Sequence, residues 1–131
     1  MTSEQRFPFR FDPAFRLPLA LLGVRPSTAR VRVGDDLDIR FGRFRLSTPW
    51  SNVAGAEVSG PFKAHRAIGP RLSLADRGVT FGTSTRRGVC IRFHRPVGAL
   101  LGERRLRHPG ATVTVADPDG LQAAIADRLG R

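Results

Sequence analysis

The chain has 131 residues, of which 40% are hydrophobic, and this predicts one domain with a single core rather than a disordered chain. Its 22 Lys and Arg residues outnumber 11 Asp and Glu residues, and the formal net charge of +11 favours nucleic acid, anionic lipid or an acidic protein as partner. Cys90 is the only cysteine, which excludes an intrachain disulfide and a cysteine-rich metal site.

The longest apolar run, residues 17–24, contains Pro18 and is far shorter than the ~20 residues of a membrane-spanning helix. The cationic start of the chain is not followed by the apolar segment of an export signal. We therefore expect a cytoplasmic protein, with a peripheral location at the inner face of the membrane as an open alternative.

Residues 1–28 are expected to form an apolar lead-in to the domain. Three phenylalanines alternate with Pro8 and Arg10, and because proline cannot donate to a β-ladder, this segment is confined to a sheet edge or a bulge. Residues 15–22 are rich in leucine but interrupted by Pro18, and we interpret them as an apolar linker.

From residue 29 to residue 115 the sequence predicts a series of short antiparallel β-strands. Alternating apolar residues in 29–33 and 37–41 flank the turn Gly34–Asp36, which is typical of a hairpin, and the alternation continues after Gly42. The arginines between these apolar residues should share the outer face of neighbouring strands. We predict that this face binds polyanions through Arg30, Arg32, Arg40, Arg43 and Arg45.

A second basic segment lies between two Gly-Pro pairs, at residues 61–68. Phe62 is next to Lys63 and close to Arg66, and interfacial membrane binders combine apolar side chains with cations in this way. We predict that Lys63 and Arg66 add to polyanion binding and that Phe62 is a membrane wedge.

Three alternating apolar runs between residues 72 and 97 predict a three-stranded antiparallel meander, and residues 112–115 predict a last strand after a loop over 98–110. Asp117 is a good N-cap and Pro118 suits the first helical turn, so residues 117–130 should form an amphipathic helix. The expected core contains Phe41, Phe44, Trp50, Phe81, Ile91 and Phe93 together with Leu121, Ile125 and Leu129 of the helix.

The sequence shows no side-chain spacing typical of a catalytic or metal site. Cys90 and His94 would lie roughly 13 Å apart at about 3.3 Å per strand residue, too far for a nucleophile and its base. Neither His65 nor His108 completes a zinc-binding spacing with His94, and we expect all three histidines to be surface or capping groups. We therefore expect no catalysis, no metal and no cofactor.

Four stretches, covering most of the chain from Arg32 onward, carry a resemblance to a known family. They are RVGDDLDIRFGRFRL, TPWSNVAGAEVSGPF, PRLSLADRGVTFGTSTRRGVCIRFHRPV and LRHPGATVTVADPDGLQAAI. In these stretches the chain resembles an actinobacterial family of small uncharacterised proteins with a bacterial pleckstrin-homology-like fold. The resemblance implies a mainly β fold, a split barrel of about seven antiparallel strands capped by the C-terminal helix, and it transfers no catalytic residues.

Taken together, these features predict a noncatalytic binding or scaffold module that presents a basic surface to an acidic partner. An anionic membrane surface is the first candidate. Nucleic acid is the alternative because exposed arginines bind phosphates, although the sequence shows no recognition helix and no series of exposed aromatic residues. A protein partner, including a second copy bound through a sheet edge, is the third class.

Overall fold

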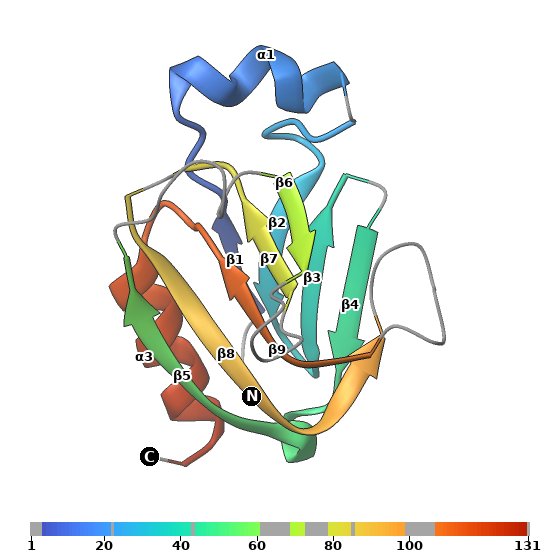
Figure 1. Cartoon of the computed structure of the whole chain (residues 1–131). Coiled ribbons are helices and arrows are strands. Elements are labelled where there is room, and N and C mark those ends of the chain that lie inside the picture. Colours follow the sequence, from blue (N-terminus) through green and yellow to red (C-terminus); the bar gives the residue numbers. More distant parts are fainter. Residues whose placement is uncertain are drawn as a thin grey trace.

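The computed structural model describes residues 4–21, 23–42, 44–60, 69–72, 79–84, 86–98 and 107–130. These residues form two β-sheets, with helix α1 (Pro13–Leu21) across one end of the sheets and helix α3 (Pro118–Arg128) along one side (Figure 1). The prediction of a mainly β fold with a C-terminal helix is therefore confirmed.

The first sheet has four antiparallel strands in chain order. They are β1 (Gln5–Pro8), β2 (Ala29–Val33), β3 (Leu37–Phe41) and β4 (Phe44–Thr48). Strand β1 occupies an edge, as Pro8 predicts, and β2 and β3 form the hairpin expected around Gly34–Asp36. One row of buried side chains across this sheet faces the core, and it consists of Phe7, Val31, Ile39 and Leu46.

The second sheet has the strand order β5-β8-β9-β7-β6. Its strands are β5 (Val53–Ser59), β6 (Gly69–Leu72), β7 (Val79–Gly82), β8 (Gly88–Gly98) and β9 (Arg107–Val113). A short 3-10 helix, η1 (Trp50–Asn52), connects β4 to β5 and so carries the chain between the sheets. Neighbouring strands are antiparallel except β7 and β9, which are parallel.

The antiparallel meander predicted for residues 72–97 is wrong, because β9 lies between β7 and β8. Strands β6 and β7 form a hairpin, but β7 leads into a buried polar segment instead of a tight turn. The N–H of Thr83 donates to Thr114 Oγ1 at 2.8 Å, and the Ser84 hydroxyl donates to Asp12 Oδ1 at 2.9 Å. These bonds hold the end of β7 against other parts of the chain, and the free edge of β7 pairs with β9.

The two sheets do not close into a barrel, so the predicted split barrel of about seven antiparallel strands is not confirmed. On one side, a bridge joins Phe9 to Val115, and the Arg10 N–H donates to Thr114 O at 2.9 Å. On the other side, β4 and β8 approach each other without forming a ladder. The described strands therefore form an open sandwich that is joined along one edge.

Aromatic rings connect the two sheets through the core. Phe41 of the first sheet packs against Phe9 and Phe81, with ring centroids 5.3 Å apart in each pair. The predicted core residues that are buried are Phe41, Phe81, Ile91, Phe93, Leu121 and Ile125. Phe44, Trp50 and Leu129 are only partly buried and pack at the border of this core.

Helix α3 packs against β5 and β8 and reaches the hairpin of the first sheet. Its predicted N-cap is confirmed, because Asp117 Oδ1 accepts a hydrogen bond from the Gly120 N–H at 3.0 Å. Gln122 Nε2 donates to Ala56 O at 3.2 Å, and in the last turn Arg128 Nη1 donates to Gly34 O at 2.6 Å. The helix thus connects the second sheet to the β2–β3 hairpin of the first sheet.

The predicted linker at residues 15–22 is wrong, since residues 13–21 form helix α1. Gly23, at φ 84°, donates its N–H to Ala20 O at 3.0 Å, and the Val24 N–H donates to Leu19 O at 2.9 Å. This pair of bonds is a Schellman motif, and its usual apolar contact is available because Leu19 and Val24 are both buried. The signals for the helix were Pro13 at its start and Gly23 at its end.

Candidate anion-binding face

The outer face of the first sheet carries two rows of polar side chains that strand register aligns. The arginine row consists of Arg30, Arg40 and Arg45, which are opposite one another on β2, β3 and β4. The mixed row consists of Arg6, Arg32, Asp38 and Ser47, one from each strand. Apolar residues between these positions face the core, so the alternation of the sequence sets both rows on one surface.

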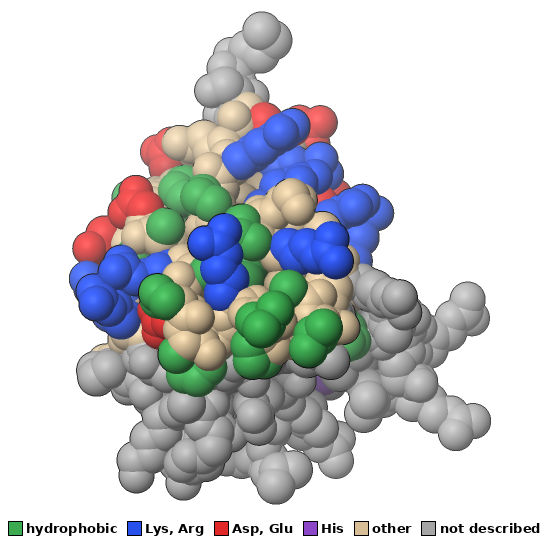
Figure 2. All heavy atoms as spheres, turned by 90° about the horizontal axis from the view of Figure 1, so that it is seen from above, with side chains coloured by type: hydrophobic (Ala, Val, Ile, Leu, Met, Phe, Trp, Pro, Cys, Tyr) green, Lys and Arg blue, Asp and Glu red, His purple; other side chains and the backbone are tan. Residues whose placement is uncertain are grey.

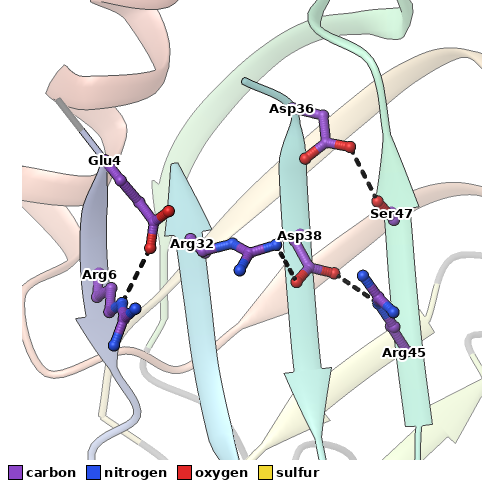
Figure 3. Close-up of polar contacts among 7 residues, drawn as sticks. All are labelled: Glu4, Arg6, Arg32, Asp36, Asp38, Arg45 and Ser47. Carbon is purple, nitrogen blue, oxygen red and sulfur yellow. Dashed lines mark hydrogen bonds and ion pairs between the residues drawn. The ribbon is translucent and has the colours of Figure 1, made fainter. Parts of the chain in front are cut away.

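Asp38 is the internal counter-ion of this face. Its carboxylate is flanked by two arginines, with Arg32 Nη2 at 3.1 Å from Oδ2 and Arg45 Nε at 3.0 Å from Oδ1 (Figure 3). The Asp38 side chain is only 4% exposed, whereas those of Arg32 and Arg45 are 32% and 53% exposed. One buried carboxylate therefore partly neutralises two arginines that the sequence analysis predicted as polyanion-binding residues.

Arg30 and Arg40 differ from these two arginines. They pair with each other across β2 and β3, and among the described residues neither makes an ion pair. Arg40 is exposed and also faces Arg45 across the next ladder. Like charges directly opposite one another destabilise a sheet, so this alignment has a cost that a bound anion would offset.

Charge changes sign along the strands of this sheet. At the hairpin end, Glu4 is 3.0 Å from Arg6 Nε, and Asp36 accepts a 3.4 Å hydrogen bond from the Ser47 hydroxyl (Figure 3). The arginine row lies at the other end, which adjoins α1: Gly42, directly after β3, donates its N–H to Thr28 O at 2.9 Å. The basic end of the face and helix α1 are therefore at the same end of the molecule.

The structure brings four of the predicted site residues together on this face: Arg30, Arg32, Arg40 and Arg45. The other predicted site residues, Arg43, Phe62, Lys63 and Arg66, lie outside the described residues. Arg6 was missed because the sequence does not show that residues 5–8 pair with β2, which sets Arg6 opposite Arg32. The alternation of side chains along the strand could have identified Asp38, because it sets Asp38 on the same face as Arg40.

The cysteine and the histidines were considered for catalysis and metal binding. Cys90 is half-buried on β8, and His94 is exposed on the same strand. His108 is fully buried, so its prediction as a surface or capping group is wrong; strand β9 begins before it and sets it opposite Val97 of β8. His65 lies outside the described residues. Within the described ranges, no three His, Cys, Asp or Glu side chains are grouped as metal ligands.

Comparison with known proteins gives no match: no family model, curated protein or solved structure is similar to this chain. Among the described residues, neither α1 nor α3 has the length and apolar character to cross a membrane.

Proposed function

We propose that this protein is a noncatalytic binding module whose first sheet binds an anionic surface, with an anionic membrane as the partner. The observation that carries the proposal is the cross-strand pair of Arg30 and Arg40, which has no acidic partner among the described residues. An anionic bilayer offers many phosphates in one plane. A row of guanidinium groups can contact several of these phosphates at once.

The position of the acidic residues would orient the protein on an anionic surface. Glu4, Asp35 and Asp36 are at the hairpin end, and the arginine row is at the α1 end. A molecule with this charge asymmetry turns its basic end toward an anionic surface before contact. Because the cytoplasmic leaflet is the one with a negative surface potential, the proposal locates the protein at the inner, cytoplasmic face of a membrane, as a peripheral protein.

Nucleic acid is a weaker candidate partner for this face. Single strands are usually bound by exposed aromatic rings that stack on bases. The described aromatic side chains are either buried or half-buried against the core. Binding through this face would then depend on phosphate contacts alone. A duplex competes for the same arginines, which makes it the informative comparison ligand.

We also propose that the fold of this protein is related to the pleckstrin-homology-like fold. Phosphoinositide-binding relatives of that fold are expected to use basic residues in an early hairpin. Here that hairpin, Gly34–Asp36, carries two aspartates, and its carbonyl at Gly34 accepts bonds from Trp50 and Arg128. We therefore propose recognition of surface charge rather than of one phosphoinositide headgroup.

The experiment compares the parent with Arg30→Gln/Arg40→Gln in sedimentation with vesicles of phosphatidylcholine and phosphatidylglycerol in equal parts. Each cation near an anionic bilayer contributes about 1 kcal/mol, so the double variant should bind roughly thirtyfold more weakly. Binding by the parent should also weaken as salt is raised. Glutamine keeps much of the side-chain length, and removing opposed like charges should not lower the free energy of unfolding.

The matched control is Arg92→Gln/Arg95→Gln, which removes the same number of charges from β8 in the second sheet. Of these two arginines, Arg92 pairs with Glu57 at 3.0 Å, in an exposed contact that contributes little to stability. If the control variant lost as much vesicle binding as Arg30→Gln/Arg40→Gln, net charge rather than this face would explain binding, and the proposal would be wrong.

A further inference from the structure

Helix α1 presents an apolar surface to solvent. Leu17 and Leu21 are one helical turn apart, and their exposed fractions are 72% and 82%. Ala14 and Pro18, at the same spacing, are exposed beside them. A surface helix normally has polar residues on its outward side, and a helix that is apolar all round is normally covered. The outer side of α1 therefore has the composition of a covered surface.

The helix is held firmly on its inner side. Leu19 is 2% exposed and belongs to the core cluster, and the Schellman motif fixes the end of the helix through Val24. At the start, the Asp12 N–H donates to Thr83 O at 3.0 Å, and the Asp12 carboxylate accepts from the Ser84 hydroxyl. Leu17 and Leu21 are thus held outward by an anchored element.

Three exposed arginines lie on α1 or close to its ends in the sequence. Arg16 is on the helix, Arg10 precedes it and Arg25 follows it, and all three side chains are exposed. Within the described part of the chain, none of the three makes an ion pair. Figure 2 looks onto this end of the molecule and shows hydrophobic and cationic side chains next to one another on the described surface.

We propose that α1 is a membrane-insertion element, with Leu17 and Leu21 in the acyl boundary of an anionic bilayer and Arg10, Arg16 and Arg25 at the lipid phosphates. This inference deepens the proposed function and rests on it. It assigns the apolar contact to α1, a helix that the sequence did not predict, in addition to the arginine row that lies at the same end of the sheet.

Charge and size favour a bilayer over a protein as the occupant. Two copies of this chain joined through α1 would bring Arg10, Arg16 and Arg25 of each copy together, and like charges oppose that contact. A stable protein interface uses about 20–30 residues on each side, whereas α1 has 9 residues with two exposed leucines. A small apolar element with cations on it and at its ends is sufficient for reversible interfacial binding.

The test uses the full chain with Leu17→Ala/Leu21→Ala and the same phosphatidylcholine–phosphatidylglycerol vesicles. Removing the buried methylene groups should weaken vesicle binding by about tenfold or more per leucine. Leu17→Phe/Leu21→Phe is the conservative variant, and it should bind at least as tightly as the parent. Neither pair should change binding to duplex DNA, which has no apolar interior.

Depth of insertion gives a second readout. A tryptophan introduced by Leu21→Trp should be quenched by lipids with brominated acyl chains. Trp50 is an internal control, because its indole N–H donates to Gly34 O at 2.9 Å, at the end of the first sheet that is farther from α1. The Trp50 fluorescence of the parent protein should therefore be unaffected by the brominated lipids.

The outcomes separate this inference from the proposed function. If the double alanine variant binds vesicles as tightly as the parent while Arg30→Gln/Arg40→Gln loses binding, the insertion of α1 is contradicted and the proposed binding through the basic face is supported. If both variants lose vesicle binding and Leu21→Trp is quenched, both proposals are supported. The inference is overturned if the parent forms dimers, the double alanine variant does not, and the tryptophan of Leu21→Trp is not quenched by the brominated lipids. That result would assign α1 to self-association.

Discussion

Trp50 and Arg128 meet at one carbonyl group. The Trp50 indole N–H donates to Gly34 O at 2.9 Å, Arg128 Nη1 donates to the same oxygen at 2.6 Å, and the guanidinium lies 6.0 Å from the indole centroid. Three segments far apart in the sequence are joined here: the hairpin of the first sheet, the connection between the sheets and the last turn of α3. This contact explains how a helix on the second sheet also fixes the first.

Arg128→Met should lower the free energy of unfolding by about 1–3 kcal/mol, because the charged hydrogen bond to Gly34 and the contact with the Trp50 ring are both lost. Urea unfolding followed by circular dichroism measures the change. Arg95→Met, at an exposed position on β8, is the control and should change stability by less than about 0.5 kcal/mol. Equal effects of the two substitutions would contradict the bridging role of Arg128.

Asp38→Asn should have opposite effects on stability and on vesicle binding. Asparagine cannot replace the charge that compensates Arg32 and Arg45, so the free energy of unfolding should fall by about 1–3 kcal/mol. The basic face gains one net positive charge, and vesicle affinity should rise roughly fivefold at low salt. Urea unfolding and vesicle sedimentation of the same preparation measure both effects. Weaker vesicle binding by a folded variant would show that Asp38 positions the arginines for the lipid.

Ile125→Ala and Leu17→Ala should differ sharply in stability. Ile125 is fully buried in α3, and large-to-small changes at such positions cost about 2–5 kcal/mol. Leu17 is exposed on α1, so its replacement should change the free energy of unfolding by less than about 0.5 kcal/mol. Thermal and urea unfolding compare the two variants. A large cost for Leu17→Ala would mean that the leucine is covered within the free protein.

Gly42→Ala tests the close contact between β3 and the segment after α1. The residue has φ 63°, and an added Cβ would be 3.0 Å from Gly23 O and 3.1 Å from Val24 Cγ2. The left-handed backbone alone should cost about 1–2 kcal/mol, and the contact should add to this. Gly23→Ala is the matched control, since Gly23 has φ 84° but nothing within 4 Å of an added Cβ. A smaller loss for Gly42→Ala than for Gly23→Ala in urea unfolding would contradict this packing.

The basic face shows how far residue parity can predict a site. Alternation of apolar and charged residues correctly set Arg30, Arg32, Arg40 and Arg45 on one side of the sheet, because side chains in a strand alternate between two faces. The alternation does not fix the register between two strands, so the alignment of Arg30 with Arg40 came from the structure. It also does not say that Asp38 reaches both Arg32 and Arg45.

The sequence by itself determined the local elements: the hairpin around Gly34–Asp36, the alternation of the later strands, and the helix that Asp117 caps. Turns, caps and periodicity depend on residues a few positions apart. Only the tertiary structure decided that β9 inserts between β7 and β8, that the sandwich stays open, and that α1 ends with Leu19 buried and Leu17 exposed. These outcomes depend on which distant segments compete for the same sheet edge and the same core surface. Local sequence patterns carry no information about that competition, because the competing segments are far apart in the chain.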